Sequence, residues 1–206
     1  MPSDKIVFGI DNGVSGTVAV FHNGKLIDFQ ETPVKKWLKP TVKSRASYMA
    51  RIDVKQLVDW LRFYSDGNQS IAVIERSMTD QRRFHATLSS HHAQEAIMIA
   101  LEWCNIPYMT IDSSVWQKRE LKGVSGSEFL KRASMEKCLK DYPQFEYVLK
   151  KHGDGDAILI AKTAVIDPSC FVSDLDRKPV KVDKEFKKKF KTNFSNKGND
   201  KCKSIS

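Results

Sequence analysis

The sequence predicts an α/β fold in which a mixed β-sheet is flanked by helices. Apolar runs typical of strands dominate the first part of the chain. The pair Asn23-Gly24 between two of these runs is a strong hairpin signal, because both residues tolerate positive φ. Helical and strand patterns then alternate, as expected for β-α-β crossovers. With 206 residues, the chain has the length of one domain, with or without a tail.

Four strands and one helix are expected in the first half of the chain. The apolar runs place the first three strands at 5–11, 16–22 and 25–31. Residues 35–51 are basic and weakly patterned, so we expect a loop there. Apolar residues at helical spacing begin at Ile52, and the turn residues 66–68 end this helix. The run SIAVIERS at 70–77 predicts the fourth strand, which ends on Glu75.

Helices and strands alternate in the second half. Residues 86–104 are predicted as a helix and the run PYMTID at 107–112 as a strand. A further helix is predicted over 126–140, where Tyr142-Pro143 closes it. A Gly-rich loop then leads to two aspartates that begin the last helix.

Positive charge is concentrated at the C-terminal end of the chain. The formal net charge is +9, and from Arg177 onward there are 11 basic residues against 3 acidic ones. We therefore expect a folded domain over 1–170 and a Lys-rich tail over 171–206. Such a tail favours a polyanionic partner, most often nucleic acid, although a solubilising extension is the alternative. Its three phenylalanines, from Phe186 to Phe194, recur at helical spacing, which is compatible with a docking stripe or with a tethering arm.

The composition argues against some classes of protein. No apolar run approaches the roughly 20 residues needed to span a bilayer, so no membrane partner is expected. The N-terminal MPSDK leads directly into a strand pattern, and we expect no signal peptide. Four cysteines lie far apart without CxxC spacing, which argues against a zinc ribbon and suits a reducing compartment. We therefore expect a cytoplasmic protein.

Carboxylates stand where buried elements end or begin. Asp11 ends the first strand, Glu75 ends the fourth, and Asp154 and Asp156 open the last helix. A carboxylate beside a buried run costs several kcal/mol unless it is paired or binds a cation. If the first and fourth strands are adjacent and parallel, Asp11 and Glu75 come side by side, and a divalent cation would relieve their repulsion. Oxygen-only ligands favour Mg²⁺ or Mn²⁺, and four carboxylates can hold the two ions used in phosphodiester hydrolysis.

Each of these positions also has a structural interpretation. Asp11 begins an ordinary turn sequence, and Glu75 could pair with an arginine of the loop that follows it. Asp154 is a good N-cap residue, and Asp156 in the first turn would interact favourably with the helix dipole. The four acids taken together with the basic tail favour the metal site.

Four segments together resemble a known family. GIDNGVSGTVAVF, AVIERS, SSVWQKRELKG and KKHGDGDAILIAKTA occur in the order typical of the RuvC-like Holliday junction resolvases, which belong to the ribonuclease H-like superfamily. The resemblance covers residues 5–166 and has the character of the divergent members carried by phages and other viruses. It implies a ribonuclease H-like mixed five-stranded sheet flanked by helices, with the nuclease domain at 1–170 and a basic C-terminal extension after it.

The resemblance also implies a reaction and its residues. A family member is a homodimer that uses Mg²⁺, or Mn²⁺ in its place, to cut two opposed strands of a four-way DNA junction. Asp11 matches the aspartate of the first strand, and Glu75 matches the glutamate of the fourth. Asp156 matches the final aspartate. The remaining position of the acidic site is open between Asp154 and His152.

Residues near these positions are candidates for DNA contact. They are Lys35, Lys36, Arg82, Arg83, Phe84, Lys118 and Arg119. Phe84 could stack on an unpaired base, or it could belong to the core. The resemblance makes Lys118 a candidate phosphate ligand, and we expect Trp116 to pack.

The predicted helix at 86–104 is apolar around much of its circumference. This is compatible with a core face together with a dimer contact. His91 and Glu95 lie four residues apart in it, but they do not form a His-Glu-x-x-His motif, and we interpret them as structural.

Two other classes of function fit parts of the sequence. A catalytically inactive branched-DNA-binding protein would accommodate the irregular fourth ligand. An ATP-dependent phosphotransferase of the same superfamily also has an acid and a Gly-rich turn on its first strand. Those proteins are usually much longer and have a second phosphate loop, which the sequence does not show.

Overall fold

The computed structural model describes residues 5–38, 48–79 and 81–166. The chain divides into two units, Met1–Asp174 and Leu175–Ser206, and all described residues belong to the first. The predicted tail at 171–206, with its phenylalanines, lies outside the described residues. Among the described helices, none combines the length and the apolar character that a membrane crossing requires.

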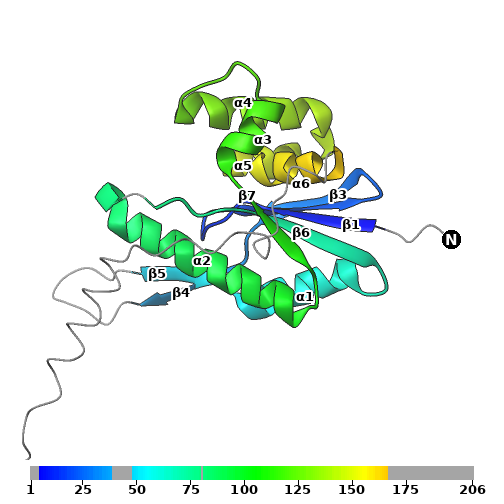
Figure 1. Ribbon diagram of the computed structural model, residues 1–206, viewed down its shortest axis with the longest axis vertical. Helices are drawn as coiled ribbons and strands as arrows, with labels where there is room; N and C mark the ends of the chain where they lie inside the picture. The colour runs from blue at the N-terminus through cyan, green and yellow to red at the C-terminus, as the bar shows by residue number, and fades with distance from the viewer. Residues whose placement is uncertain (1–4, 39–47, 80, 167–206) are drawn as a thin grey trace, which may run out of the picture. The chain divides into compact units, whose positions relative to one another are not determined.

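The described residues form seven strands, six α-helices and two short 3₁₀ helices (Figure 1). The strands are β1 (Lys5–Ile10), β2 (Thr17–His22), β3 (Lys25–Glu31), β4 (Val34–Leu38), β5 (Tyr48–Ile52), β6 (Gln69–Glu75) and β7 (Tyr108–Ile111). The α-helices are α1 (Val54–Ser65), α2 (Phe84–Trp103), α3 (Ser113–Glu120), α4 (Ser127–Asp141), α5 (Glu146–His152) and α6 (Asp156–Ile166). The 3₁₀ helices are η1 (Gln81–Arg83) and η2 (Pro143–Phe145).

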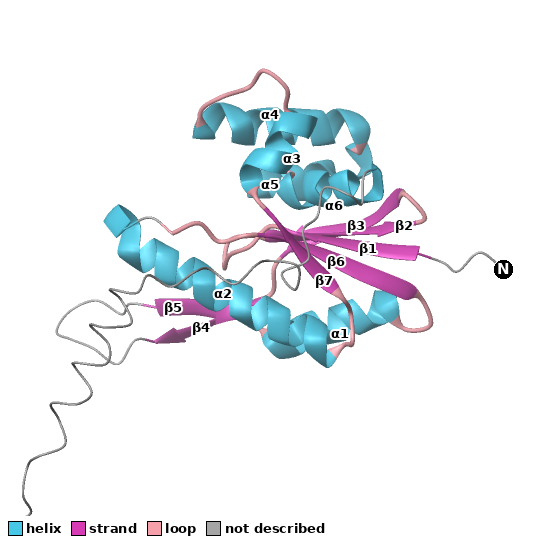
Figure 2. Ribbon diagram, in the orientation of Figure 1, coloured by secondary structure: helices cyan, strands magenta, loops and turns pink. Residues whose placement is uncertain are grey.

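Five strands form the main sheet, in the order β3-β2-β1-β6-β7. The central strand β1 pairs antiparallel with β2 and parallel with β6. At the edges, β3 is antiparallel to β2 and β7 is parallel to β6. The predicted fold class is therefore confirmed: the chain has an α/β fold with a mixed five-stranded sheet flanked by helices (Figure 2). The predicted hairpin is also present, with Asn23 at φ 49° and Gly24 at φ 79°.

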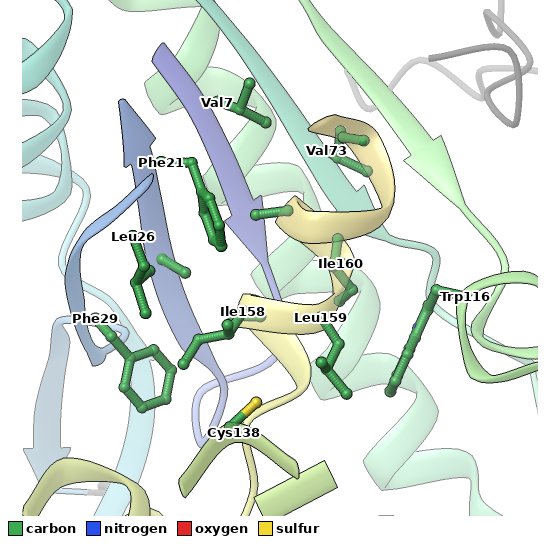
Figure 3. Close-up of a cluster of buried hydrophobic side chains, with 14 of the residues drawn as sticks. Val7, Phe21, Leu26, Phe29, Val73, Trp116, Cys138, Ile158, Leu159 and Ile160 are labelled. Carbon is green, nitrogen blue, oxygen red and sulfur yellow. The ribbon is translucent and has the colours of Figure 1, made fainter. Parts of the chain in front are cut away.

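Helices cover both faces of the sheet (Figures 1 and 2). The helices α1 and α2 lie on one face, and α3, α4, α5 and α6 lie on the other. Side chains of β1 alternate between the two cores, as strand geometry requires. Phe8 and Ile10 belong to the core on the side of α1 and α2. Val7 belongs to the core on the side of α6, which we call the α6-side core (Figure 3).

Helix α6 approaches the central strand very closely at Gly9. A Cβ atom on Gly9 would stand 2.2 Å from the carbonyl oxygen of Ala157 and 2.6 Å from the Cβ of Ala161. No side chain fits in that space, so the glycine allows the helix to pack against the backbone of β1. Since Ala157 follows Asp156, this contact brings the first residue of α6 to the end of β1.

The prediction of a loop at 35–51 is wrong at both ends of that segment. Strands β4 and β5 pair antiparallel, with Lys35 opposite Arg51 and Lys36 opposite Ala50. The sequence does not reveal this hairpin, because its basic side chains lack the apolar alternation typical of strands. The pairing itself depends on backbone hydrogen bonds, which do not require that pattern. Residues 39–47 lie outside the described part of the chain.

No pattern in the sequence predicts α3 or α5. Both helices are short, and the buried residue of α3 is Trp116 alone, so the helical period has too few apolar positions to show itself. The other predicted helices and strands are present with shifted bounds. The predicted order, with strands first and then alternating helices and strands, is therefore present. The missed helix α3 matters because it carries Trp116, a residue of the candidate site.

Candidate metal centre

Asp11 and Glu75 lie at the ends of two neighbouring parallel strands, on the same face of the sheet. Strands β1 and β6 are in register through Ile10 and Ile74, so the next residue of each comes side by side. Both acids continue the alternation that places Val73 in the α6-side core. The two carboxylates therefore face the start of α6, as expected for adjacent parallel strands.

The loop between α5 and α6 brings three polar residues to the same place: His152, Asp154 and Asp156. Gly153 ends α5 in the left-handed conformation at φ 93°, which turns the chain back towards the sheet. The N–H of Gly155 donates to Ser134 Oγ at 3.0 Å and so ties this loop to α4. Helix α6 begins at the next residue.

Asp11, His152 and Asp154 form the tightest donor group among the described residues. One ligand atom from each lies within 4.8 Å of the other two. His152 Nε2 is 3.4 Å from Asp154 Oδ1. Both candidates for the remaining site position therefore stand next to Asp11. Glu75 and Asp156 are near enough for their charges to act on Asp11 as well.

Burial and mutual repulsion raise the pKa values of three of the acids. Burial is the main cause of each shift, and at Asp11 the neighbouring carboxylates add to it, so that its pKa lies well above the usual value. Burial raises the pKa of Glu75 to about 7. A hydrogen bond from Trp116 acts against this rise, and the charges of Asp156 and Asp154 add to it. Burial and the charge of Asp154 raise the pKa of Asp156 to about 6.

The pKa of Asp154, in contrast, is lowered. Its burial alone would raise its pKa, but the interaction with His152 and the positive charge of Lys131 outweigh burial and lower the pKa. Lys131 Nζ lies 3.4 Å from Asp154 Oδ2. The cluster therefore holds one acid that is stabilised in its charged form beside three that burial and repulsion favour in the neutral form.

The residues present fit a divalent cation. Within the described residues, Asp154 Oδ1 and Asp156 Oδ1 are buried without a hydrogen-bond partner, although His152 Nε2 lies within ion-pair distance of Asp154 Oδ1, at 3.4 Å. Buried acceptors of this kind are rare, because they cost free energy unless water or an ion completes them. Carboxylate oxygens together with an imidazole form a donor set that divalent metals accept, and the oxygens favour Mg²⁺ or Mn²⁺.

A tryptophan holds Glu75. Trp116 Nε1 donates to Glu75 Oε2 at 2.8 Å, and the Trp116 side chain is only 1% exposed. The prediction that Trp116 packs is confirmed, whereas its hydrogen bond to the acid was not predicted. Arg76, the arginine that follows Glu75, binds Asp112 at 2.8 Å and Thr110 Oγ1 at 2.9 Å.

A hydrogen-bond network connects the turn after β1 with α2. Asn12 Nδ2 donates to Ser77 Oγ and, at 3.3 Å, to the carbonyl oxygen of Ser90. The backbone N–H of Ser77 donates to Gln94 Oε1 at 2.8 Å. The network fixes the backbone that follows both strand acids. No sequence signal reveals it, because these residues meet only once α2 is packed on the sheet.

Lys131 and Ser134 are further residues of the site that the sequence pattern did not reveal. They lie three residues apart on α4, which places them on one side of that helix. Lys131 contacts Asp154, and Ser134 holds the loop before α6. Their spacing is a signal in the sequence, but it has meaning only when it is known that this side of α4 faces the acids.

Two groups of the predicted DNA-binding residues lie on separate elements. Lys35 and Lys36 are exposed on β4, where Lys35 pairs with Asp53 at 2.9 Å. Lys118 is exposed on α3, and Arg119 is partly buried on the same helix. These four residues are therefore divided between two elements, β4 and α3.

The third group of these residues lies where α2 begins. Arg82 and Arg83 belong to η1 and are exposed. Phe84 is the first residue of α2 and is 64% exposed, so the alternative that places it in the core is wrong. An exposed aromatic ring next to two arginines remains available to a ligand.

Helix α2 is apolar beyond its core face, as the sequence predicted. Exposed apolar side chains lie along it at Leu88, Ile99 and Trp103. A groove between β5 and α2 begins beside the turn after β1, and its lining includes Val14, Arg51, Ile52, His85, Leu88 and Ile99. His91 lies 3.3 Å from Thr79 Oγ1 through its Nε2 atom.

Comparisons with known proteins give similarity in structure only. The chain is similar to Thermus thermophilus RuvC in complex with a Holliday junction substrate, with a TM-score of 0.47 and 14% identity over 81% of this chain and 97% of that chain. A second Thermus thermophilus RuvC structure has a TM-score of 0.42 and 13% identity over 77% of this chain and 92% of that one. No family model matches the chain, and no curated protein matches it. The candidate site therefore rests on its own geometry.

Proposed function

We propose that this protein is a Holliday junction resolvase, a metal-dependent, structure-selective endonuclease that hydrolyses phosphodiesters at four-way and other branched DNA junctions. The observation that supports this most strongly is the convergence of Asp11, Glu75, Asp154 and Asp156 from three parts of the fold, with buried carboxylate oxygens left unsatisfied. The proposal includes a phage or viral type of the RuvC-like family and action in the cytoplasm, of the host if the chain is viral.

We infer Mg²⁺ as the cofactor, with Mn²⁺ able to replace it. Asp11 would be the shared ligand, because it follows the central strand and interacts with the other three acids. Asp154 or His152, Glu75 and Asp156 would complete the set. When bound, a pair of such cations supplies an activated water and neutralises charge on the departing 3′-oxygen.

The chain itself would keep the site ready for a negatively charged substrate. His152 and Lys131 hold Asp154 in its ionised form, so that at least one strong ligand is present before any cation arrives. The Lys131 side chain is 67% exposed and would offset the charge that a phosphodiester brings to the acids.

Affinity for DNA would come mainly from cationic side chains around the acids. The exposed candidates are Lys36, Arg82, Arg83 and Lys118, with Lys35, Arg119 and the tail at 171–206 adding further charge. Phe84 would stack on an unpaired base at the branch point, because its ring is exposed and lies next to two arginines.

We also propose that the protein is a homodimer and that α2 forms the contact. Leu88, Ile99 and Trp103 are exposed and lie within one side of this 20-residue helix. Two opposed strands of one junction require two active sites, which a two-fold dimer supplies. Light scattering at micromolar concentration should give twice the 23.5 kDa mass of one chain. Paired nicking of a junction by a strict monomer would contradict this part of the proposal.

The test of the function is cleavage of labelled four-way junctions, forks and linear duplexes with Mg²⁺, Mn²⁺, Ca²⁺ or EDTA. We expect paired nicks in the junction with Mg²⁺, which disappear in EDTA and in Asp11→Asn. The variant should still bind the junction, because phosphate contacts supply most of the affinity. Tight binding without cleavage in any metal would indicate a catalytically inactive branched-DNA-binding protein. ATP turnover without nicking would indicate a phosphotransferase.

A further inference from the structure

The indole of Trp116 occupies a fixed position between the hydrophobic core and the acids. Helix α3 begins two residues after β7, and its one buried side chain is Trp116. Figure 3 shows the ring within the α6-side core, among residues such as Leu159 and Ile160. Its polar edge points out of this core, since Nε1 donates to Glu75 Oε2 at 2.8 Å. A ring that is 99% buried cannot turn to another partner without opening the core.

Glu75 is the acid of the cluster that most needs such a restraint. It has one more rotatable bond than the three aspartates, and fixing a glutamate side chain costs about 1.5–2 kcal/mol of rotamer entropy. Asp154, by comparison, is held by Lys131 and His152. An indole N–H can only donate, so it favours the carboxylate in its ionised, metal-binding form.

We propose that Trp116 is a positioning residue, which fixes Oε2 of Glu75 so that Oε1 is presented to a divalent cation. This inference rests on the proposed metal centre, and it goes beyond that proposal by assigning a role to a residue that touches neither metal nor substrate. Hydrogen bonds from residues behind a metal ligand set the orientation of that ligand, and their loss typically reduces metal affinity about 10- to 100-fold.

The chain offers a matched control at Trp60. Its Nε1 donates to Asp28 Oδ2 at 2.9 Å, so Trp60→Phe also removes one indole–carboxylate hydrogen bond but leaves the acidic cluster untouched. Both phenylalanine variants keep an aromatic ring, and their thermal unfolding shows whether each is folded. Mn²⁺ binding is measured by calorimetry without DNA, so the result does not depend on catalysis.

We expect Trp116→Phe to bind Mn²⁺ at least about tenfold more weakly than the wild-type protein, and Trp60→Phe to bind it as the wild-type protein does. Wild-type affinity in Trp116→Phe would overturn the positioning role. If Glu75→Gln nevertheless binds Mn²⁺ more weakly than the wild-type protein, that outcome leaves the proposed metal centre intact. If Glu75→Gln also binds Mn²⁺ like the wild-type protein, the proposed role of Glu75 as a ligand fails, and the positioning role fails with it.

A measurement on the wild-type protein covers the case in which Trp116→Phe does not fold. The chain has four tryptophans, so the indole ¹H–¹⁵N signals can be assigned from single Trp→Phe variants, that of Trp116 by elimination if necessary. On titration with Mg²⁺, the signal of Trp116 should move as Glu75 becomes polarised, while those of Trp60 and the exposed Trp103 stay in place. An unmoved Trp116 signal at saturating Mg²⁺ would contradict the inference.

Discussion

Two carboxylates of the main sheet accept a hydrogen bond from a tryptophan, and their surroundings differ in every other respect. On β3, Asp28 accepts at Oδ2 from Trp60 Nε1 at 2.9 Å and from Tyr64 OH at 2.8 Å. Its Oδ1 accepts from the N–H of Phe29 at 2.8 Å. At the end of β6, Glu75 also accepts a hydrogen bond from an indole, that of Trp116, but the charges of Asp154 and Asp156 raise its pKa and its own charge acts on Asp11.

The difference distinguishes an acid that stabilises the fold from an acid that belongs to a candidate metal site. Asp28 is a single acid whose two oxygens accept hydrogen bonds from its own neighbours, so these hydrogen bonds stabilise the fold. The acids near Asp11 repel one another, and Asp154 Oδ1 and Asp156 Oδ1 remain buried without a donor. The first arrangement is complete without a ligand, whereas the second leaves acceptor oxygens that the proposed cation would complete.

The largest expected effect separates these two regions by activity. Asp11→Asn should reduce junction cleavage at least about a thousandfold, because losing a ligand shared by two cations removes several kcal/mol of transition-state stabilisation. Asp28→Asn should cleave like the wild-type protein. Single-turnover cleavage of a labelled junction with Mg²⁺ measures both variants, and comparable loss in the two would remove the distinction.

Stability should change in the opposite sense. An asparagine at position 28 has only one acceptor oxygen for the three donors around it, so Asp28→Asn should lose about 1–3 kcal/mol in the free energy of unfolding. Asp11→Asn removes a charge from a repelling cluster, so the metal-free variant should be no less stable than the wild-type protein. Denaturant unfolding in EDTA at pH 8 compares the two.

Divalent cations should stabilise the wild-type protein strongly. At about 100 times the dissociation constant, a ligand of the folded state adds about 2.7 kcal/mol to the free energy of unfolding. For a chain of this size, that corresponds to a rise of about 5–10 °C in Tm. Asp28→Asn should show the same rise in Tm, although its Tm without metal is lower, and Asp11→Asn should lose most of this rise. Calorimetric scans with and without Mg²⁺ test this, and an equal rise in both variants would place the cation elsewhere.

The metal-free protein should become less stable as the pH rises from 5 to 8. The pKa values of Asp156 and Glu75, about 6 and about 7, lie above their unfolded values. The folded protein therefore holds protons that the unfolded chain has lost, and this stability disappears as the pH passes through the folded pKa values. The fall should be on the order of a few kcal/mol.

Two conditions sharpen this pH prediction. Glu75→Gln should flatten the upper part of the profile, because it removes the group that titrates there. Saturating Mg²⁺ should reverse the slope, since a cation binds the ionised carboxylates. Urea midpoints across the pH range measure both effects, and a flat profile in EDTA would contradict the raised pKa values of Glu75 and Asp156.

The strand acids were readable in the sequence for a physical reason. An apolar run that ends on a carboxylate marks both Asp11 and Glu75, and β-α-β crossovers make their strands parallel, so their ends meet at one edge of the sheet. The choice between Asp154 and His152 was not readable. It depends on the left-handed turn at Gly153, and that turn brings both residues to Asp11.

Features that depend on distant partners were missed. Trp116 and Glu75 are 41 residues apart, and nothing local to either one signals their hydrogen bond. The β4–β5 hairpin is hidden because its pairs, such as Lys35 opposite Arg51, place like charges where alternation of apolar residues would be expected. In both cases tertiary contact, rather than local preference, decides the structure.

The smallest expected effect concerns the one acid of the cluster whose pKa is lowered. Lys131→Met removes a cation 3.4 Å from Asp154, and the pair is exposed on the lysine side, so stability should change by less than about 1 kcal/mol. The same change removes a charge that competes with a bound metal, so Mn²⁺ affinity should rise about two- to threefold. The neighbouring Arg132, which pairs with Glu136 at 2.7 Å on the same helix, provides the control. Arg132→Met should leave the Mn²⁺ affinity unchanged, and an equal gain in both variants would show that general surface charge, rather than contact with Asp154, sets the affinity.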